Sequence, residues 1–360
     1  MISSTPIVSI IMTVYNGSPY LEESVKSVLI QSFNDFEFII IDDCSTDNSW
    51  DLLSNYAISD RRIRLLRNRQ NMGLTKSLNR GLHLAQGKYI ARQDADDVSL
   101  PTRFEKQIAW LESHPETVLI SSEIQRIKPN GNFGKVTARA CPADFLPWHL
   151  IFHNHLGGHS QVMFHRQPVL DLGGYNEAYR YSQDYELWCR LAQVGKLAVL
   201  PEALLNQRFH TGSISANKQS EQNALVLKQV TYNIEQLTGK TPPLSTVENL
   251  HRLWSTDQDS KAHRFPESGL AHYLSNWLDT IYKAYISQPD LTAPPLFKQA
   301  LRGLIGQKFL TWANTLSLRK QLLIKIQLYL LALRWAPQQT LKPRSTPTMT
   351  MSALWETANG

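Results

Sequence analysis

The stretch Phe36-Glu37-Phe38-Ile39-Ile40-Ile41-Asp42-Asp43 is an almost wholly apolar run that ends at two adjacent carboxylates. A short run rich in β-branched and aromatic residues is typical of a strand buried on both faces of a sheet. Such strands belong to parallel sheets whose two faces are covered by helices. The stretch therefore predicts an α/β fold, with both carboxylates at the carboxyl end of a buried strand.

The segments around this stretch alternate between strand and helix patterns. A β-rich run at 6–15 precedes it, and Ser18-Pro19 begins an amphipathic helix between the two runs. The patterns that follow are a helix from Ser45 through Leu53, a strand at 63–66, a helix at 74–85 and a strand at 88–91. Strict alternation predicts parallel βαβ units. We therefore expect a mostly parallel, Rossmann-like sheet flanked by helices.

Polar side chains gather where these strands end. The three sets are Thr13, Tyr15 and Asn16; Asp42 and Asp43; and Asp94, Asp96 and Asp97. In open α/β sheets the ligand binds beyond the carboxyl ends of the strands. The three sets are therefore expected to meet at one ligand site, although they are distant in the sequence.

The segment Asp94-Ala95-Asp96 is the strongest candidate for a metal site. Alternate residues of an extended segment project to the same side. Two carboxylates on one side suit a hard divalent cation such as Mg²⁺ or Mn²⁺. The alternative for this segment is the acidic first turn of a helix. The alternative for Asp43 is the N-cap of a helix. The position at the end of a strand favours the cation.

The rest of the chain divides the protein into three expected parts. Residues 1–215 would form the domain that contains the ligand site, and 216–335 a helical C-terminal region. Residues 336–360 are rich in Pro, Thr and Ser and are expected to be disordered.

The net charge of +6 lies in the C-terminal part, since residues 216–360 hold 16 Lys and Arg against 9 Asp and Glu. Within it, 297–335 contains seven basic residues and no acidic one, and its leucines recur at helical spacing. Such a segment can lie on an anionic membrane surface. Packing against the catalytic domain, with the basic face in water, is an equal alternative. No nucleic-acid-binding module is recognisable, so no nucleic-acid partner is expected.

Three cysteines, Cys44, Cys141 and Cys189, form no disulfide or zinc-binding pattern. The N-terminus lacks the basic and apolar regions of a signal peptide, and no apolar stretch reaches about 20 residues. We therefore expect a protein of the reducing cytoplasm, peripheral on the inner face of the membrane if 297–335 binds lipid.

The ordered motifs of residues 6–215 resemble the family 2 inverting glycosyltransferases, which have the GT-A fold. The matching blocks are Ile10–Asn16, Ile41–Asp47, Asn71–Leu74, Ala85–Ile90, Asp94–Asp97 in the D-x-D position, Gly173–Tyr175 and Gln183–Trp188. Together these blocks are far more specific than any single motif.

The resemblance implies a role for each matching position. The nucleotide-sugar would be bound by Thr13, Tyr15, Asp43, Gly73, Lys76, Asp94 and Ala95. Asp96 would be the main metal ligand, for Mg²⁺ or Mn²⁺, with His210 as a further metal or phosphate contact. Asp184 would be the catalytic base, and His159 and Trp188 would line the acceptor site.

One position departs from the family pattern, because Gln183 stands where the family often has Glu. The base is retained at Asp184, but the neighbour that tunes it is neutral. Glu186 is a second carboxylate nearby, and Asp184 is preferred because the motif places the base directly before Tyr185. A helix N-cap is the structural alternative for Asp184. The histidines between 153 and 165 do not fit a closed zinc site.

The expected activity is metal-dependent, inverting transfer of a sugar from a nucleotide-sugar, by resemblance a UDP-sugar. Its acceptor would be a hydroxyl of a glycan or of a lipid-linked molecule. Two other functions were compared with it. A sugar-nucleotide pyrophosphorylase would need a Gly- and Arg-rich loop after the first strand, which 15–20 lacks. A non-catalytic nucleotide or glycan binder would be expected to lack Asp96 or Asp184, and both are present.

Overall fold

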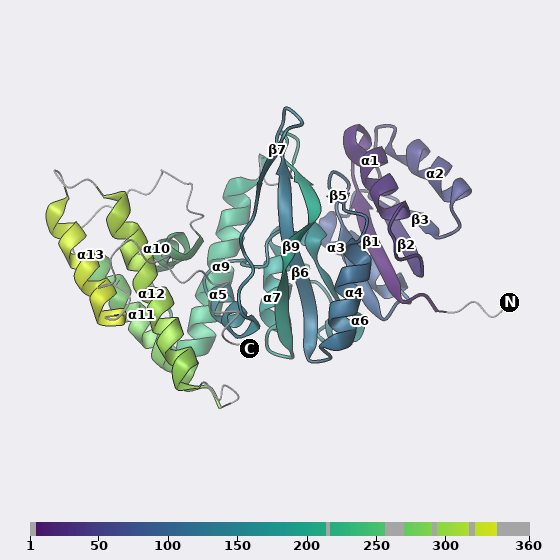
Figure 1. The fold of residues 1–360 in the computed structure, drawn as a ribbon. Coiled ribbons are helices and arrows are strands. Elements are labelled where there is room, and N and C mark those ends of the chain that lie inside the picture. The colour runs from purple at the N-terminus through teal and green to yellow at the C-terminus, as the bar shows by residue number, and fades with distance from the viewer. Residues whose placement is uncertain (1–4, 214–216, 256–269, 290–293, 317–320, 337–360) are drawn as a thin grey trace. The chain divides into compact units, whose positions relative to one another are not determined.

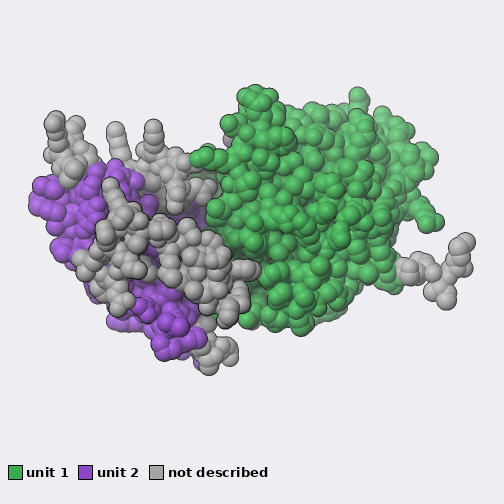
Figure 2. Space-filling view, viewed as in Figure 1, with its two compact units in different colours: residues 1–147, 154–225 green, residues 148–153, 226–360 purple. Residues whose placement is uncertain are grey.

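The computed structural model describes residues 5–213, 217–255, 270–289, 294–316 and 321–336. The chain divides into two compact units, shown in Figure 2. Unit 1 comprises Met1–Pro147 and Asn154–Leu225, and unit 2 comprises Trp148–His153 and Val226–Gly360. The domain boundary expected near residue 215 stays a prediction, and the tail expected to be disordered lies outside the described residues from 337 onward.

Unit 1 is built on one sheet with the strand order β3-β2-β1-β4-β8-β6-β9-β5, and β7 pairs with β6. The strands are β1 Val8–Val14, β2 Phe36–Asp42, β3 Ile63–Arg67, β4 Tyr89–Gln93, β5 Val98–Ser99, β6 Thr117–Ile127, β7 Phe133–Val136, β8 Met163–His165 and β9 Lys196–Arg208. The first four are parallel, as the sequence predicts. The other half of the sheet is mixed, because β8 runs antiparallel between β4 and β6.

The strand order contains a reversal that fixes the position of a ligand crevice. From β1 the chain moves outward to β2 and β3, then returns to place β4 on the other side of β1. Such a switch point leaves a crevice beyond the carboxyl ends of the two central strands. Here the central strands are β1, which leads to Tyr15, and β4, which leads to Asp94.

The helices of the chain are labelled in Figure 1. They are α1 Ser18–Leu29, α2 Ser49–Ser59, α3 Leu74–Leu84, α4 Arg103–Ser113, α5 Leu146–Leu150, α6 Arg166–Asp171, α7 Gln183–Leu191, α9 Gln219–Thr238, α10 Leu244–Ser255, α11 Leu270–Ile286, α12 Pro295–Thr315 and α13 Leu322–Trp335, with 3₁₀ turns at η1 Ala143–Phe145 and η2 His159–Gln161.

The two faces of β1 are buried against different helices, which explains its continuous apolar sequence. Val8, Ile10, Met12 and Val14 belong to one core with side chains of α1 and α4. On the other face, α3 packs so closely that a Cβ at Gly81 would lie 2.7 Å from Ile11 Cγ2. The sheet is thus rigidly held on both sides, and the polar residues at its edge have a fixed frame.

Unit 2 is helical and has an aromatic core. Trp148 packs edge-on against Phe152, Trp254 and Tyr285, with ring centroids 5.4, 5.8 and 5.2 Å away. The last helix, α13, buries Leu328, Leu331, Ala332 and Trp335. Its other side exposes Leu322, Leu323, Ile326 and Leu330. Among the residues that the structure describes, no helix combines the length and the apolarity that crossing a membrane requires.

Candidate active site

The turns after β1 and β2 are locked together at the carboxyl edge of the sheet. Asn16 has a left-handed backbone (φ 53°), and its Oδ1 accepts the Thr46 amide at 2.8 Å. In return, the amides of Asn16 and Gly17 donate to Ser45 Oγ and Ser49 Oγ at 3.0 and 2.9 Å. These bonds leave the Tyr15 side chain 54% exposed. A rigid loop with an outward aromatic ring is suited to stacking on a nucleobase.

Asp43 builds the neighbouring loop. Its Oδ1 accepts Asn68 Nδ2 at 2.6 Å, the Met72 amide at 2.9 Å and Ser77 Oγ at 3.1 Å. Its Oδ2 accepts the Gly73 amide at 2.8 Å. A carboxylate oxygen has about two lone pairs, so Oδ2 keeps one for a ligand. Asp43 is therefore mainly a loop-forming residue, with limited capacity to accept from a base.

Gly73 and Lys76 begin α3 beside this loop. Gly73 has φ 85°, and a Cβ there would have no neighbour within 4 Å. Its backbone conformation therefore requires glycine, while the space next to it is open. Lys76 is exposed in the first turn of the helix. Thr13, near the end of β1, is half-buried, and the Gly73 amide is held by Asp43 just after β2, so these residues lie at the same edge of the sheet.

The three carboxylates after β4 have different partners. Asp94 Oδ1 forms an ion pair at 2.6 Å with the fully buried Arg92. Asp96 Oδ2 lies 2.9 Å from His210 Nε2. Asp97 is buried and accepts the Arg208 amide at 2.9 Å, which ties this turn to the end of β9. Asp97 is thus structural, whereas the side chains of Asp94 and Asp96 are 33% and 29% exposed.

Neighbouring carboxylates in this turn raise one another's pKa values. Burial raises the pKa of Asp96, the charge of Asp94 raises it further, and His210 only partly opposes them. Burial and the charges of Asp96 and Asp94 raise the pKa of Asp97 well above its usual range. An added cation would relieve this strain. The carboxylate oxygens and the imidazole nitrogen fit Mn²⁺ or Mg²⁺, so the donor set present suits the implied metal.

Asp184 stands in the first turn of α7, behind Ser182, which has φ 55°. Its Oδ2 accepts Asn154 Nδ2 at 3.1 Å. Burial raises the pKa of Asp184 to about 6, the Tyr185 amide opposes this, and Asp94 adds to it. A carboxylate with a pKa near neutrality is well matched to general-base chemistry. Glu186 instead pairs with Arg190 at 2.7 Å, so it is a structural residue.

Several polar atoms around Asp184 have no protein partner. Within the described residues, Asn154 Oδ1, Gln183 Oε1 and Trp188 Nε1 are buried without a hydrogen bond. Unpaired buried groups are rare in folded proteins and call for an explanation such as a bound ligand or water. Asn154 is the hydrogen-bond partner of Asp184, and Gln183 and Trp188 lie on the same helix as Asp184.

The two residues expected at the acceptor side lie in the interior. His159 is buried, and its Nε2 lies 2.8 Å from Tyr175 Oη. Trp188 is fully buried, with its ring centroid 5.8 Å from that of His159. Direct contact of either ring with an acceptor stays a prediction. The structure adds Arg92 and Asn154 to the site, and it also brings there Tyr175, which lies in a matching block but had no role of its own.

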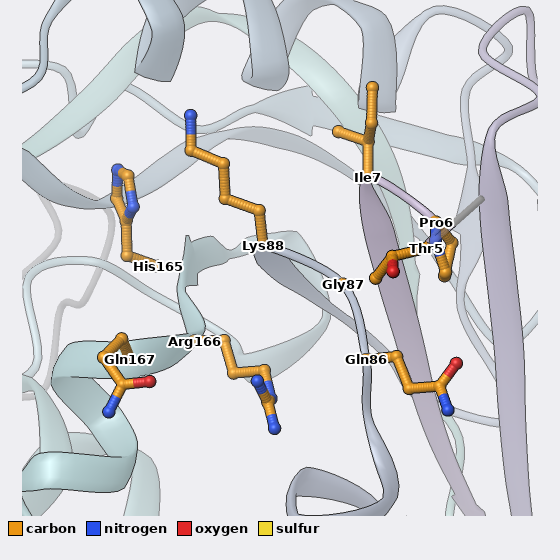
Figure 3. A pocket seen from close by; sticks show the side chains of 9 residues that line it. All are labelled: Thr5, Pro6, Ile7, Gln86, Gly87, Lys88, His165, Arg166 and Gln167. Atoms are coloured by element: carbon orange, nitrogen blue, oxygen red, sulfur yellow. The ribbon is translucent and has the colours of Figure 1, made fainter.

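A separate hollow of about 400 Å³ lies at the amino ends of β1 and β4, away from the carboxylates. It is lined in part by Gln86, Lys88, His165 and Arg166. Figure 3 shows the Lys88 and His165 side chains pointing to one side and those of Gln86 and Arg166 to the other. No set of functional groups converges there, so the carboxyl edge remains the candidate site.

Comparisons with known proteins identify relatives of the chain. Residues 9–180 match the family model described as glycosyl transferase family 2. The chain is 31% identical over 214 residues to the putative teichuronic acid biosynthesis glycosyltransferase TuaG of Bacillus subtilis, covering 59% of this chain and 83% of TuaG.

Solved structures show the same fold at low sequence identity. The S. aureus TarS 1–349 structure in complex with UDP-GlcNAc aligns with a TM-score of 0.54 and 14% identity, over 91% of each chain. The mannosyltransferase PcManGT of Pyrobaculum calidifontis, in complex with GDP-Man and Mn²⁺, aligns with a TM-score of 0.51 and 18% identity, over 92% of this chain and 87% of that one.

Proposed function

The chain belongs to glycosyltransferase family 2 and has the GT-A fold, and from that premise we propose that it catalyses metal-dependent, inverting transfer of a sugar from a UDP-sugar to an acceptor hydroxyl. The observation that carries this proposal is Asp184, whose pKa burial raises to about 6. It shares the site with Asp94, whose charge contributes to that shift.

The base mechanism follows from this pKa. Above pH 6, Asp184 is mostly ionised and accepts the proton of an acceptor hydroxyl as that oxygen attacks the anomeric carbon. The Asn154 amide holds one carboxylate oxygen and so orients the other. A single displacement opposite the leaving nucleotide inverts the anomeric centre. Because no covalent intermediate forms, no nucleophilic carboxylate is required.

The donor is held at the ends of β1 and β2. Tyr15 offers a stacking surface, Thr13 and Lys76 offer polar contacts, and Asp43 Oδ2 has one remaining lone pair for an N–H of the base. Uracil and guanine both present such an N–H. The structures of TarS and PcManGT contain UDP-GlcNAc and GDP-Man, which makes these two donors the natural first probes.

Asp96 and His210 would hold a divalent cation, Mn²⁺ or Mg²⁺, with Asp94 beside them. When bound, the cation supplies positive charge against the diphosphate. The protein contributes the placement, since the Arg92 guanidinium fixes Asp94 and the Arg208 amide fixes the buried Asp97 behind Asp96. Gly73 leaves open space for the nucleotide, and Ala95 lies between the two partly exposed carboxylates Asp94 and Asp96.

The acceptor is proposed to be a glycan or a lipid-linked glycan precursor, because TuaG is named for teichuronic acid biosynthesis. Unit 2 supports a peripheral membrane position on the inner face. The exposed leucines of α13 end next to the exposed Arg334, and 297–335 contains no acidic residue. Exposed apolar residues combined with basic ones favour an anionic lipid surface.

Flotation with liposomes tests the membrane proposal. We expect the full chain to float with vesicles containing phosphatidylglycerol, and the variant Leu323→Glu/Leu330→Glu to remain in solution. Equal flotation of both proteins would contradict this surface. Replacing the exposed Tyr232 by Glu is a matched control that changes charge elsewhere in the unit.

A screen of nucleotide-sugars tests the enzymatic proposal. Thermal shift with UDP-GlcNAc and GDP-Man, each with and without Mn²⁺, should show a rise in Tm that requires the metal. Asp96→Ala should remove the metal-dependent part. An unchanged shift in that variant would exclude Asp96 as a metal ligand. A chain that binds a nucleotide-sugar but releases no nucleoside diphosphate with any acceptor glycan would instead favour the non-catalytic alternative.

A further inference from the structure

A buried chain of hydrogen bonds runs from the metal side of the site toward the acceptor side. It starts at Asp94, which pairs with Arg92 at 2.6 Å. Arg92 Nε then reaches His159 Nδ1 at 3.5 Å, and His159 Nε2 reaches Tyr175 Oη at 2.8 Å. The members come from β4, η2 and the turn after α6, so only the folded chain brings them together.

Arg92 determines which atom donates and which accepts in each of these hydrogen bonds. A guanidinium donates and never accepts, so His159 Nδ1 must be the accepting nitrogen. The imidazole is then neutral, with its hydrogen on Nε2. Burial and the nearby Arg92 charge keep the pKa of His159 well below its usual range, which is consistent with this tautomer. Nε2–H therefore donates to Tyr175 Oη, and the hydroxyl oxygen is the acceptor.

The hydroxyl hydrogen of Tyr175 is left without an acceptor. Tyr175 is only 2% exposed, and within the described residues His159 is the sole hydrogen-bond partner of its hydroxyl. Asp184 and Asp94 act on this hydroxyl through their charges, yet neither forms a hydrogen bond with it. This preoriented donor is thus close enough to feel the charges of the proposed base and of the D-x-D carboxylate, and its buried hydrogen needs an acceptor.

We propose that Tyr175 is a specificity-determining residue whose Oη–H donates a hydrogen bond to an oxygen of the transferred sugar. Arg92 and His159 act as positioning residues that orient this donor. The ligand class is the hydroxyl-bearing sugar of a nucleotide-sugar, and the inference rests on the proposed function. It predicts that Tyr175 contributes to binding of the sugar but not of the nucleotide.

The test compares each nucleotide-sugar with its own nucleoside diphosphate in the full-length Tyr175→Phe variant. Calorimetry with Mn²⁺ measures the affinities for UDP, UDP-GlcNAc, GDP and GDP-Man. For whichever pair the wild type binds, we expect unchanged affinity for the diphosphate and about tenfold weaker binding of the nucleotide-sugar, since one hydrogen bond to the sugar is lost. Equal affinities in variant and wild type, or equal losses for both ligands, would overturn the inference.

Two further sets of variants separate this role from a structural one. Tyr89→Phe is the matched control, because Tyr89 is also buried and its hydroxyl bonds to Glu112, at the opposite end of β4. It should leave the ratio of the two affinities as in the wild type. His159→Gln retains an acceptor and a donor and should keep part of the sugar affinity, whereas His159→Leu should match Tyr175→Phe.

The same measurements distinguish failure of this inference from failure of the proposed function. A wild type that binds no nucleotide-sugar and transfers no sugar would reject both. A wild type that binds and transfers, beside a Tyr175→Phe variant with an unchanged affinity ratio, would reject only the role of Tyr175.

Discussion

A buried carboxylate at the amino end of the β-sheet differs from the proposed metal-binding and catalytic carboxylates at its carboxyl end. At the amino end, the buried Glu37 accepts Ser9 Oγ and the Gln86 amide, each at 2.7 Å, and pairs with Arg64. At the carboxyl end, burial raises the pKa values of Asp96 and Asp184, which have fewer donors. The comparison teaches that this fold satisfies the carboxylates that hold it together and leaves under-satisfied those that meet a ligand.

Asp184→Asn should have the largest effect, because it removes the only general base that we propose. Transfer should fall by about 10³-fold, within the usual contribution of such a base, while binding of the nucleotide-sugar persists. Steady-state kinetics and calorimetry measure the two separately. Glu186→Gln is the matched control on the same helix, and activity near wild type is expected there. If Asp184→Asn retains most of its turnover, the base is another group.

Glu37→Gln tests the opposite end of the sheet. The side-chain amide of the variant would place an N–H donor against Ser9 Oγ and the Gln86 amide, which are themselves donors. The negative charge that pairs with Arg64 would also be lost. We expect a loss of about 2–3 kcal/mol in the free energy of unfolding, by analogy with bonds to charged groups. Urea denaturation measures this loss, and the KM for the nucleotide-sugar should not change. A change of KM without loss of stability would break the contrast between the two ends.

Asp184→Asn should also stabilise the protein. The pKa of Asp184 is raised from 3.8 to about 6, so the folded state binds more protons than the unfolded state between these values. Ionisation of the carboxylate therefore lowers the free energy of unfolding as the pH rises from about 4 to about 6. The free energy of unfolding stays lower at every pH above this range. Removing the charge should raise the free energy of unfolding by about 1–3 kcal/mol at pH 8 and should leave it almost unchanged at about pH 3.5. A variant less stable than the wild type at pH 8 would show that burial does not destabilise this carboxylate.

The pH dependence of transfer should be the smallest effect. Because the pKa of Asp184 is about 6, kcat/KM should rise by about tenfold from pH 5 to pH 7 and then level off. Assays at saturating Mn²⁺ measure this profile. An inflection near pH 4 would mean that the base titrates like an exposed aspartate.

Local patterns in the sequence were sufficient to predict the first half of the fold. The apolar runs of β1, β2 and β4 and the helices between them follow from the nearest residues, so the edge holding Tyr15, Asp43 and Asp94 could be inferred. The sequence marks β8 only as a short apolar run, and its place between β4 and β6 depends on long-range pairing. The mixed half of the sheet was therefore not predicted.

The candidate site was predictable only where a motif marked it. Asp94, Asp96 and Asp184 lie in matching blocks, and the geometry of the site agrees with their expected roles, which remain to be tested. Asn154 has no sequence signal, because its partner Asp184 lies 30 residues away. Arg92 lies two residues before the D-x-D segment, yet its burial and its contact with His159 arise only from tertiary packing.

The short segment Trp148–His153 belongs to unit 2 although unit 1 resumes directly after it. During synthesis on the ribosome, Trp148 and Phe152 emerge about 100 residues before Trp254, the ring against which both pack. The nascent N-terminal portion must therefore carry these two aromatic side chains without that partner until Trp254 has been made. A shortened gene ending at Leu225 would make that transient state permanent, and we expect its product to aggregate unless both rings are replaced by polar residues.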